Sequence, residues 1–407
     1  MKKTGSFMPP AIKSEKDLER YLLEAARLHQ SGCYQQAIDI YLALAELQPK
    51  AAFLHYNIAH ALSELGRYED AIKHYQTALR YLPDDEDAIF NLACCQKSGG
   101  QPQAAIDSYQ RLLALNPDHL DAGYNLGNCH KDLEQNEQAM ACYLKVLELD
   151  EQHLSAANNL AFICHKLGME REAIFYYRKV LQIDSGNVGA KYMLAALSGQ
   201  GAAIAPPDYV QGVFDNYSSH YESSLVDKLE YRVPQKIMAA FAEQFPAVVS
   251  LPHFLDLGCG SGLGAAEFRH LCGQITGVDL SPKMLELAEQ KGIYHELYCG
   301  DILEFLTGCG KMYNFILAAD VFTYMGDLSS VFSAVFSSCV SDGIFAFSIE
   351  TGENNFTLQK TGRFAHSPSY IKSELTKNGW RVPHFFQTRL RREKGQWTYG
   401  MIYFAVK

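Results

Sequence analysis

The sequence predicts an α + α/β chain, in which a solenoid of stacked helix pairs precedes a mostly parallel sheet with helices on both faces. Three observations support this prediction. A helix-like pattern repeats every 34 residues through the first half. Apolar strand-like and amphipathic helix-like segments alternate through the second half. The stretch FLDLGCGSGLGAAEF (254–268) places four glycines between a strand-like run and a helix-like run.

Composition sets the outer limits. The 407 residues are 48% hydrophobic and 20% charged, with a net charge of −10, which suits two or three domains and disfavours a nucleic-acid partner. Eleven cysteines include no CxxC pair, so we expect reduced thiols and no metal site. No apolar run follows the lysines of MKKTGSFMPP, and no apolar stretch approaches the roughly 18 residues of a membrane span. We therefore expect a cytoplasmic protein without a membrane segment.

The first half has the 34-residue period of tetratricopeptide (TPR) repeats. Small and aromatic positions recur in phase at Ala37, Ala71, Ala105, Ala139 and Ala173, and at Tyr41, Tyr75, Tyr109, Tyr143 and Tyr177. Pro49, Pro83 and Pro117 follow the second helix of a pair, because proline cannot continue a helix. We predict a tail at 1–17, then five repeats and a capping helix over 18–199.

An asparagine column follows the same period, at Asn57, Asn91, Asn125 and Asn159. It falls on the first helix of repeats two to five, which lines the concave groove of TPR superhelices. Amides there could pair with the backbone of an extended peptide, and the column resembles the asparagine ladder of the O-GlcNAc transferase superhelix. Alternatively, they bind a neighbouring helix within the array.

Residues 200–252 are expected to form a linker and two lid helices. GQGAAIAPPDYVQGVF (199–214) breaks the repeat with small residues and prolines. Beyond it, Tyr217, His220 and Tyr221 lie about one helical turn apart and could face a ligand from a lid. The alternative is that they only pack on the following domain.

The second half alternates HFLDL, QITGVD, YHELYC, YNFILAAD and GIFAFSIE with helix-like segments, which indicates a parallel, Rossmann-like sheet. WRVPHFFQTR (380–389) and WTYGMIYFAVK (397–407) predict a C-terminal antiparallel hairpin. Gly260, Gly262 and Ala265 satisfy the dinucleotide pattern G-x-G-x-x-A, so the glycine loop alone does not choose a nucleotide.

Acidic residues distinguish the two ligands. Asp256 stands two residues before Gly258, where a carboxylate would repel a pyrophosphate but would suit a ligand with an ammonium and a sulfonium group. S-adenosylmethionine (SAM) is such a ligand. Asp279 ends the second strand, where a ribose-binding acid is expected. Asp301 opens the segment GDILEF after the third strand and could accept from an adenine amino group.

These motifs resemble class I SAM-dependent methyltransferases over about 207–407. Together with the repeats, FDNYSSHYESSLVDKLEYRVP and GRFAHSPSY, the chain is similar to a bacterial family of predicted TPR-containing methyltransferases. The resemblance implies a seven-stranded methyltransferase domain over 253–407. The cofactor-binding residues that we assign on this basis are Asp256, Gly258, Gly260, Gly262, Asp279, Leu280, Asp301 and Ile302, with Asp320 and Tyr217 as further candidates.

Methyl transfer needs alignment and exclusion of water, with a base only where the acceptor atom carries a proton. His366 and Tyr324 are our catalytic candidates. His366 could instead cap the helix that opens at Pro368 or bind substrate, and Tyr324 and Asp320 could only shape the cofactor pocket. AADVFTYM after the fourth strand lacks a proline-proline-tyrosine motif, which disfavours methylation of adenine or of glutamine amides.

Three functions remain open from the sequence. The first is a SAM-dependent methyltransferase whose TPR array recruits a peptide, protein substrate or partner. The second methylates a small molecule, such as a phenol, quinone precursor or carboxylic acid, and uses the repeats for assembly. The third is a scaffold that binds SAM without turnover. The three acids Asp256, Asp279 and Asp301 argue against the third, since an inactive domain need not keep them.

Overall fold

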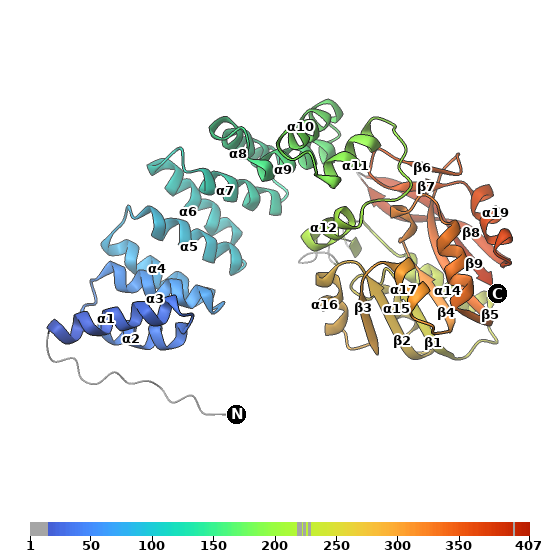
Figure 1. Cartoon of the computed structure of the whole chain (residues 1–407), viewed down its shortest axis with the longest axis horizontal. Helices are drawn as coiled ribbons and strands as arrows, with labels where there is room; N and C mark the ends of the chain where they lie inside the picture. The colour runs from blue at the N-terminus through green and yellow to red at the C-terminus, as the bar shows by residue number, and fades with distance from the viewer. Residues whose placement is uncertain (1–14, 218–221, 223–224, 227–228, 394) are drawn as a thin grey trace. The chain divides into compact units, whose positions relative to one another are not determined.

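The structure is a computed structural model that describes residues 15–217, 222, 225–226, 229–393 and 395–407. The chain divides into two compact units, Met1–Ile183 and Asp184–Lys407 (Figure 1). Helix α11, expected to cap the repeat array, therefore belongs to the second unit. Within the described residues, no helix combines the length and apolar character that crossing a bilayer requires.

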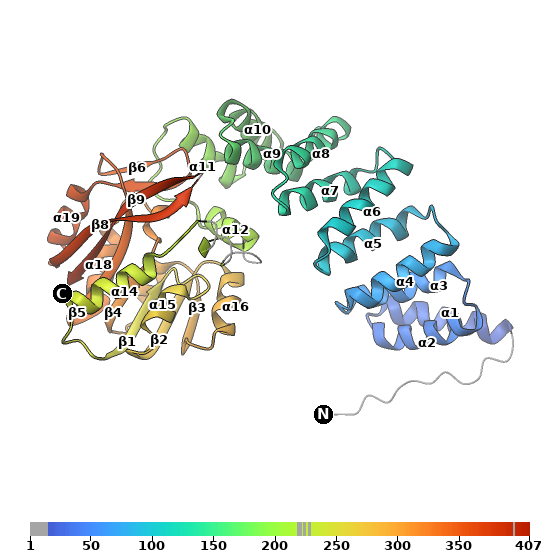
Figure 2. The same ribbon diagram turned by 180° about the vertical axis from the view of Figure 1, so that it is seen from behind.

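The described part of the first unit consists of ten helices, each packed against the next along the chain. Figure 2 shows them stacked in sequence order. Their bounds are α1 Glu15–Gln30, α2 Tyr34–Leu47, α3 Ala52–Glu64, α4 Tyr68–Tyr81, α5 Glu86–Ser98, α6 Pro102–Leu115, α7 Leu120–Asp132, α8 Asn136–Leu149, α9 Leu154–Leu167 and α10 Glu170–Ile183. The five pairs match the five predicted repeats.

The recurring alanines and tyrosines form the core of this unit. All five alanines are fully buried, and all five tyrosines are at most 4% exposed. Each small alanine lets a neighbouring helix approach, and the tyrosine fills the remaining space. A capping column also recurs every 34 residues: the side chains of Asp85, His119, His153 and Asn187 accept a hydrogen bond from the backbone N–H three residues on. These caps define where a helix begins in successive repeats and where α11 begins.

The second unit contains one sheet with helices on both faces. Its helices are α11 Val188–Leu197, α12 Pro207–Tyr217, α14 Val233–Gln244, α15 Leu263–Phe268, α16 Pro282–Gln290, α17 Ile302–Gly308, α18 Ser329–Ser338 and α19 Pro368–Lys377, with the 3₁₀ turn η3 Phe322–Tyr324. Its strands are β1 Leu251–Leu257, β2 Cys272–Asp279, β3 Glu296–Cys299, β4 Tyr313–Ala318, β5 Cys339–Thr351, β6 Phe356–Leu358, β7 Phe364–His366, β8 Arg381–Glu393 and β9 Gln396–Val406.

The strand order explains where the site lies. Strands β3-β2-β1-β4-β5 are parallel neighbours, so their carboxyl ends meet at one edge. Strand β9 runs antiparallel between β5 and β8, which confirms the C-terminal hairpin. Alternate residues of the strands face opposite sides: α14 and α15 pack on one face, and α17, α18 and α19 pack on the other.

The prediction of seven strands is wrong, because the described residues form a sheet of nine. The two extra strands, β6 and β7, are three residues long and form a short hairpin within TGENNFTLQKTGRFAHS. Glu350, near the end of β5, pairs with Ala365 of β7 and with Gly400 of β9. Strands this short show no alternation of apolar and polar residues, so periodicity could not reveal them.

The predicted linker also carries backbone pairing. Ile204 bridges Met325 in an antiparallel sense, the Ala205 N–H donates to the Tyr324 carbonyl at 2.9 Å, and the Gly326 N–H donates to the Ala203 carbonyl at 2.8 Å. Residues 203–205 are therefore part of the second unit and lie against the segment that follows η3.

Candidate functional site

The glycine loop joins β1 to α15 and adopts a backbone that requires glycine. The φ angles of Gly258, Gly260 and Gly262 are +61°, +52° and +91°, in the left-handed region that L side chains rarely adopt. A Cβ on Gly258 would lie 2.6 Å from Val321 Cγ2, and one on Gly262 would lie 3.0 Å from the Tyr294 ring. The loop therefore runs close to the segment after β4.

Asp256 lies beneath this loop, 2% exposed. Its Oδ2 accepts hydrogen bonds from the Tyr294 hydroxyl at 2.8 Å and the Ala265 N–H at 3.2 Å. Burial raises the pKa of Asp256 to about 7, although these two hydrogen bonds favour the charged form. The described residues form no salt bridge to Asp256, so none of them supplies a cation to balance its charge.

Asp279 ends the neighbouring strand β2. Its Oδ2 accepts from the Gly260 N–H and its Oδ1 from the Ser281 N–H, both at 2.8 Å, so the acid is fixed to the glycine loop. Burial raises its pKa, and the negative charge of Asp215 on α12 adds to the shift. The Ser281 hydroxyl donates to Asp215 Oδ1 at 2.6 Å. Leu280, between Asp279 and Ser281 in the sequence, is half-buried.

Asp301 follows β3 and is the N-cap of α17. Its Oδ1 accepts from the backbone N–H groups of Leu303 at 2.8 Å and Glu304 at 3.1 Å. Ile302, the first residue of the helix, is 7% exposed. Asp256, Asp279 and Asp301 thus stand at the ends of three adjacent parallel strands. Their roles toward a cofactor stay predictions, and the capping role of Asp301 was not anticipated.

Helix α12 contributes to the same edge. Besides Asp215, its Phe214 ring meets the Tyr324 ring edge-on, with centroids 5.6 Å apart. Tyr217 is the last residue of α12, and its side chain lies outside the described part of the structure, as do His220 and Tyr221. The contacts of Phe214 and Asp215 fit the expected lid, but the three residues chosen from the sequence stay a prediction.

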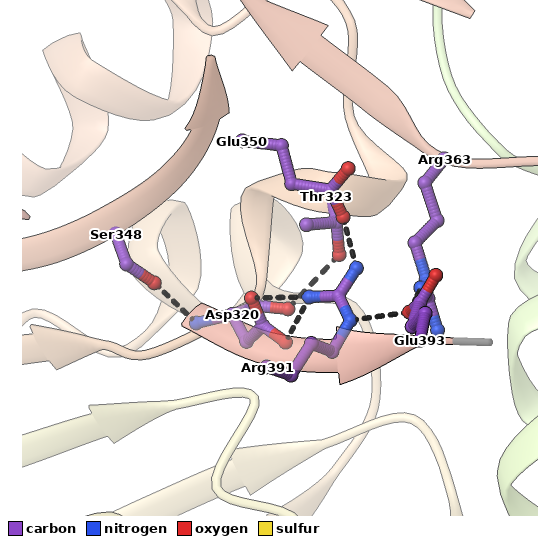
Figure 3. A network of polar contacts seen from close by, with 7 residues as sticks. All are labelled: Asp320, Thr323, Ser348, Glu350, Arg363, Arg391 and Glu393. Carbon is purple, nitrogen blue, oxygen red and sulfur yellow. Dashed lines mark hydrogen bonds and ion pairs between the residues drawn. The ribbon is translucent and has the colours of Figure 1, made fainter. Parts of the chain in front are cut away.

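Asp320 lies at the end of β4 in a charged network that the sequence did not reveal (Figure 3). Its carboxylate accepts from Arg391 Nη1 at 3.1 and 2.8 Å. Arg391 also binds Glu350 and Glu393, and Arg363 pairs with Glu393. Burial would lower the pKa of Arg391, but the neighbouring carboxylates raise it above its usual value. Burial would raise the pKa of Glu393, but Arg363 and Arg391 lower it to about 2.

The two catalytic candidates have different surroundings. Tyr324 lies in η3, half-buried beneath Phe214. His366 is fully buried; its Nε2 lies 3.0 Å from the Gly326 carbonyl oxygen, and its ring stacks on Tyr370. Burial lowers the pKa of His366 to about 4, so the ring is neutral and donates from Nε2. A role as proton acceptor would require this region to open.

Two residues that support the site gave no signal in the sequence. Tyr294 lies in the loop before β3 and holds Asp256 by its hydroxyl, yet nothing in its spacing marks it. Arg391 lies in a charged run that looks like a surface turn. A β-bulge explains the burial of this residue: the pairing of β8 with β9 shifts register between Arg389 and Arg391, so Leu390 and Arg391 are both buried.

The asparagine column of the first unit is partly exposed. Asn91 Nδ2 donates to the Tyr56 hydroxyl at 3.0 Å, and Asn159 Nδ2 donates to the Tyr124 hydroxyl at 3.4 Å and to Asn128 Oδ1 at 3.1 Å. Asn57 bonds the Phe53 carbonyl on its own helix. Asn125 occupies the equivalent position on α7. The amide nitrogens of Asn91 and Asn159 thus bind a neighbouring helix within the array, in keeping with the alternative of a structural role, and a role of the column in peptide binding stays a prediction.

The fold and the acids around the glycine loop define a Rossmann-like domain of the methyltransferase class, placed after helical repeats. Comparison with known families agrees: the family described as "Methyltransferase domain" matches residues 255–347. Families described as "Tetratricopeptide repeat" match residues 56–119, 98–161 and 154–187. The chain therefore carries TPR repeats followed by a methyltransferase domain, which confirms the predicted fold class.

Individual relatives cover only parts of the chain. Methyltransferase-like protein 27 of Homo sapiens is 35% identical over 99 residues, which is 24% of this chain and 40% of that protein. The N-methyltransferase NodS from Bradyrhizobium japonicum WM9 is 15% identical with a TM-score of 0.40, over 48% of this chain and 97% of NodS. YrrB, described as a TPR protein with an unusual peptide-binding site, is 22% identical with a TM-score of 0.40, over 44% of this chain and 92% of YrrB.

Proposed function

We propose that this chain binds SAM at the glycine loop and transfers its methyl group to an acceptor that docks beside the end of β4. The observation that supports this most is Asp256. A buried carboxyl with no cationic partner among the described residues suits a ligand that brings a positive charge. A dinucleotide would instead bring a pyrophosphate toward that carboxyl, and like charges repel.

The donor and acceptor groups around the loop fit SAM. Asp256 would bind the ammonium group, and the glycines Gly258, Gly260 and Gly262 let the ligand approach the backbone closely. Among the described residues, the buried Ser261 hydroxyl completes no hydrogen bond of good geometry, although the Glu222 carboxylate lies close enough to interact with it. A ligand seated on the loop would give that hydroxyl a partner.

Asp279 and Asp301 would hold the nucleoside. Each oxygen of Asp279 accepts one backbone hydrogen bond, which leaves lone pairs for ribose hydroxyls. Leu280 follows it and would lie along the ribose. Asp301 uses Oδ1 to cap α17, so Oδ2 is the oxygen we assign to the adenine amino group, with Ile302 beside the ring.

SAM supplies an electrophilic methyl group on a sulfonium. The residues of this chain would align the acceptor and exclude water. Phe214 and Tyr324 form an aromatic contact over the strand ends, and Asp320 is fixed beside Val321, which packs on Gly258. Both oxygens of Asp320 accept hydrogen bonds from Arg391 Nη1, which fixes the orientation of this carboxylate. We therefore assign alignment to Asp320 and Tyr324 and a positioning role to His366.

We further propose that the TPR repeats recruit a peptide, a protein substrate or an assembly partner. The hydrogen bonds from Asn91 to Tyr56 and from Asn159 to Tyr124 fix the amide orientation. With Nδ2 held in this way, Oδ1 is the atom of each amide that we assign to accept a backbone N–H of a bound peptide.

Calorimetry with SAM and with S-adenosylhomocysteine (SAH) tests the cofactor, with NADH as the dinucleotide control. We expect SAM and SAH to give a heat of binding and NADH to give none. Binding of NADH without binding of SAM would refute the proposal. Transfer of labelled methyl groups to a lysate, separated into protein and small-molecule fractions, then tests the acceptor. Label confined to small molecules would refute a protein substrate, and SAM binding without any label transfer would favour a scaffold.

A further inference from the structure

Arg391 occupies an unusual position for a charged residue on an edge hairpin. Its side chain is 2% exposed, although β8 otherwise alternates exposed and partly buried residues. The register shift between Arg389 and Arg391 places the bulge at Leu390, and the next side chain then points into the domain (Figure 3). Bulges recur beside active sites, where they redirect one side chain.

All three nitrogens of the Arg391 guanidinium group donate hydrogen bonds to carboxylates. Nη1 binds both oxygens of Asp320, Nη2 binds Glu350, and Nε binds Glu393 at 2.6 Å. These partners come from the loop after β4, the end of β5 and β8 itself. Only arginine has a planar fork of donors that can hold three carboxylates in fixed directions.

Asp320 is held in a conformation that a non-glycine residue rarely adopts. Its φ angle is +64°, and such outliers persist only where the surroundings enforce them. Its N–H donates to Ser348 Oγ at 2.8 Å, and its carbonyl accepts from Thr323 Oγ1 at 3.0 Å. With the carboxylate on Arg391, the backbone N–H, the carbonyl and the side chain of Asp320 are all anchored.

The residues that follow Asp320 form one wall of the proposed site. Val321 packs against Gly258 of the glycine loop, and Tyr324 meets Phe214 of α12. We propose that Arg391 is a positioning residue, which fixes Asp320 and so sets residues 320–324 between the cofactor loop and the acceptor. This inference rests on the proposed function, because it assumes that the glycine loop binds SAM.

Arg391→Lys separates charge from geometry. Lysine keeps the positive charge that the three carboxylates need, but it cannot reproduce the fork. We expect the variant to fold with a lowered unfolding midpoint, while the dissociation constant for SAH rises about tenfold relative to wild type at a temperature where both chains are folded, because residues 320–324 lose their fixed position. Amide hydrogen exchange of 319–326 should accelerate in this variant and stay unchanged in β1 and β2.

Arg392→Lys is the matched control, since Arg392 lies next along the strand and forms an exposed pair with Glu230. SAH binding by Arg391→Lys within twofold of this control would overturn the inference while leaving the proposed function intact. Absence of SAH binding by the wild-type chain would overturn both. If Arg391→Lys does not fold, Ser348→Ala decides: it removes only the hydrogen bond to the Asp320 N–H, so we expect SAH binding weakened threefold or more, and wild-type affinity would refute the inference.

Discussion

Asp256→Asn separates cofactor binding from folding, because the buried carboxyl destabilises the fold when it ionises. Burial raises the pKa of Asp256 to about 7, whereas an exposed aspartate titrates near 3.9. This difference of about 3 pKa units corresponds to about 4 kcal/mol between the folded and unfolded chain. Asparagine keeps the shape of the side chain and does not ionise.

The direction of the pH dependence follows from proton binding. Between pH 4 and 7 the folded chain retains a proton that the unfolded chain has released, so the contribution of Asp256 to stability falls as pH rises through this range. The variant lacks this loss. We expect the stability of Asp256→Asn relative to wild type to increase by about 2.5 kcal/mol from pH 5 to pH 8, measured by urea unfolding. Asp342→Asn, at a carboxylate that is 86% exposed, should show no such change.

Binding of SAM should show the opposite preference, because its ammonium group favours the ionised carboxyl. At pH 6 about 0.9 of the Asp256 carboxyls are protonated, so binding should release nearly one proton. Calorimetry in buffers of different ionisation enthalpy measures this number. We expect Asp256→Asn to bind SAM about 30-fold more weakly or worse, with no proton release. Wild-type binding without proton release at pH 6, or a variant that keeps the wild-type affinity, would refute the pairing.

Three further predictions use stability measurements alone. Gly258→Ala should lose about 1–3 kcal/mol, because its Cβ would lie 2.6 Å from Val321 Cγ2; Val321→Ala in the same chain should recover part of this, and an unchanged loss would contradict the steric cause. Burial lowers the pKa of His366 to about 4 in the folded chain, below its value in the unfolded chain. Between pH 6.5 and 4 the unfolded chain therefore binds more protons, and the contribution of His366 to stability falls by about 3 kcal/mol as the pH drops through that range. His366→Gln should lack this acid-side loss in urea unfolding, and an equal loss in both chains would argue against a buried neutral imidazole. A double-mutant cycle of Tyr56→Phe and Asn91→Ala should give a coupling of about 0.5–1.5 kcal/mol, and no coupling would mean that the amide does not bind the hydroxyl.

The repeats could be predicted from the sequence almost completely, because their contacts are local and recur. Ala71 and Tyr75 are buried for the same reason in each repeat, and Pro83 follows two residues after the end of α4. The capping column was missed, although Asp85 and His119 lie 34 apart, because its four members are three different residue types. The hydrogen-bond partners of Asn91 and Asn159 could not be predicted from the sequence, because they include tyrosines of the preceding repeat.

In the methyltransferase domain, the sequence indicated those candidate residues that stand next to the glycine motif or at the end of a predicted strand. Asp256 and Asp279 lie at the carboxyl ends of their strands, and parallel pairing brings those strand ends together. The supporting residues come from distant segments: Tyr294 from the loop before β3, and Arg391 from beyond a bulge. His366 looked like a base in the sequence, and its burial on Tyr370 depends on β7, a strand too short to predict.

The segment from Ala203 to Ala205 looks like a flexible tether, yet its backbone forms hydrogen bonds with the segment after η3. Small side chains suit residues 203–205, because their backbone must approach the backbone of the segment after η3 closely. Expression of the second unit alone should therefore start upstream of Ala203. Replacing the repeats with another domain should be tolerated best at the junction of Ile183 and Asp184, where the two compact units divide.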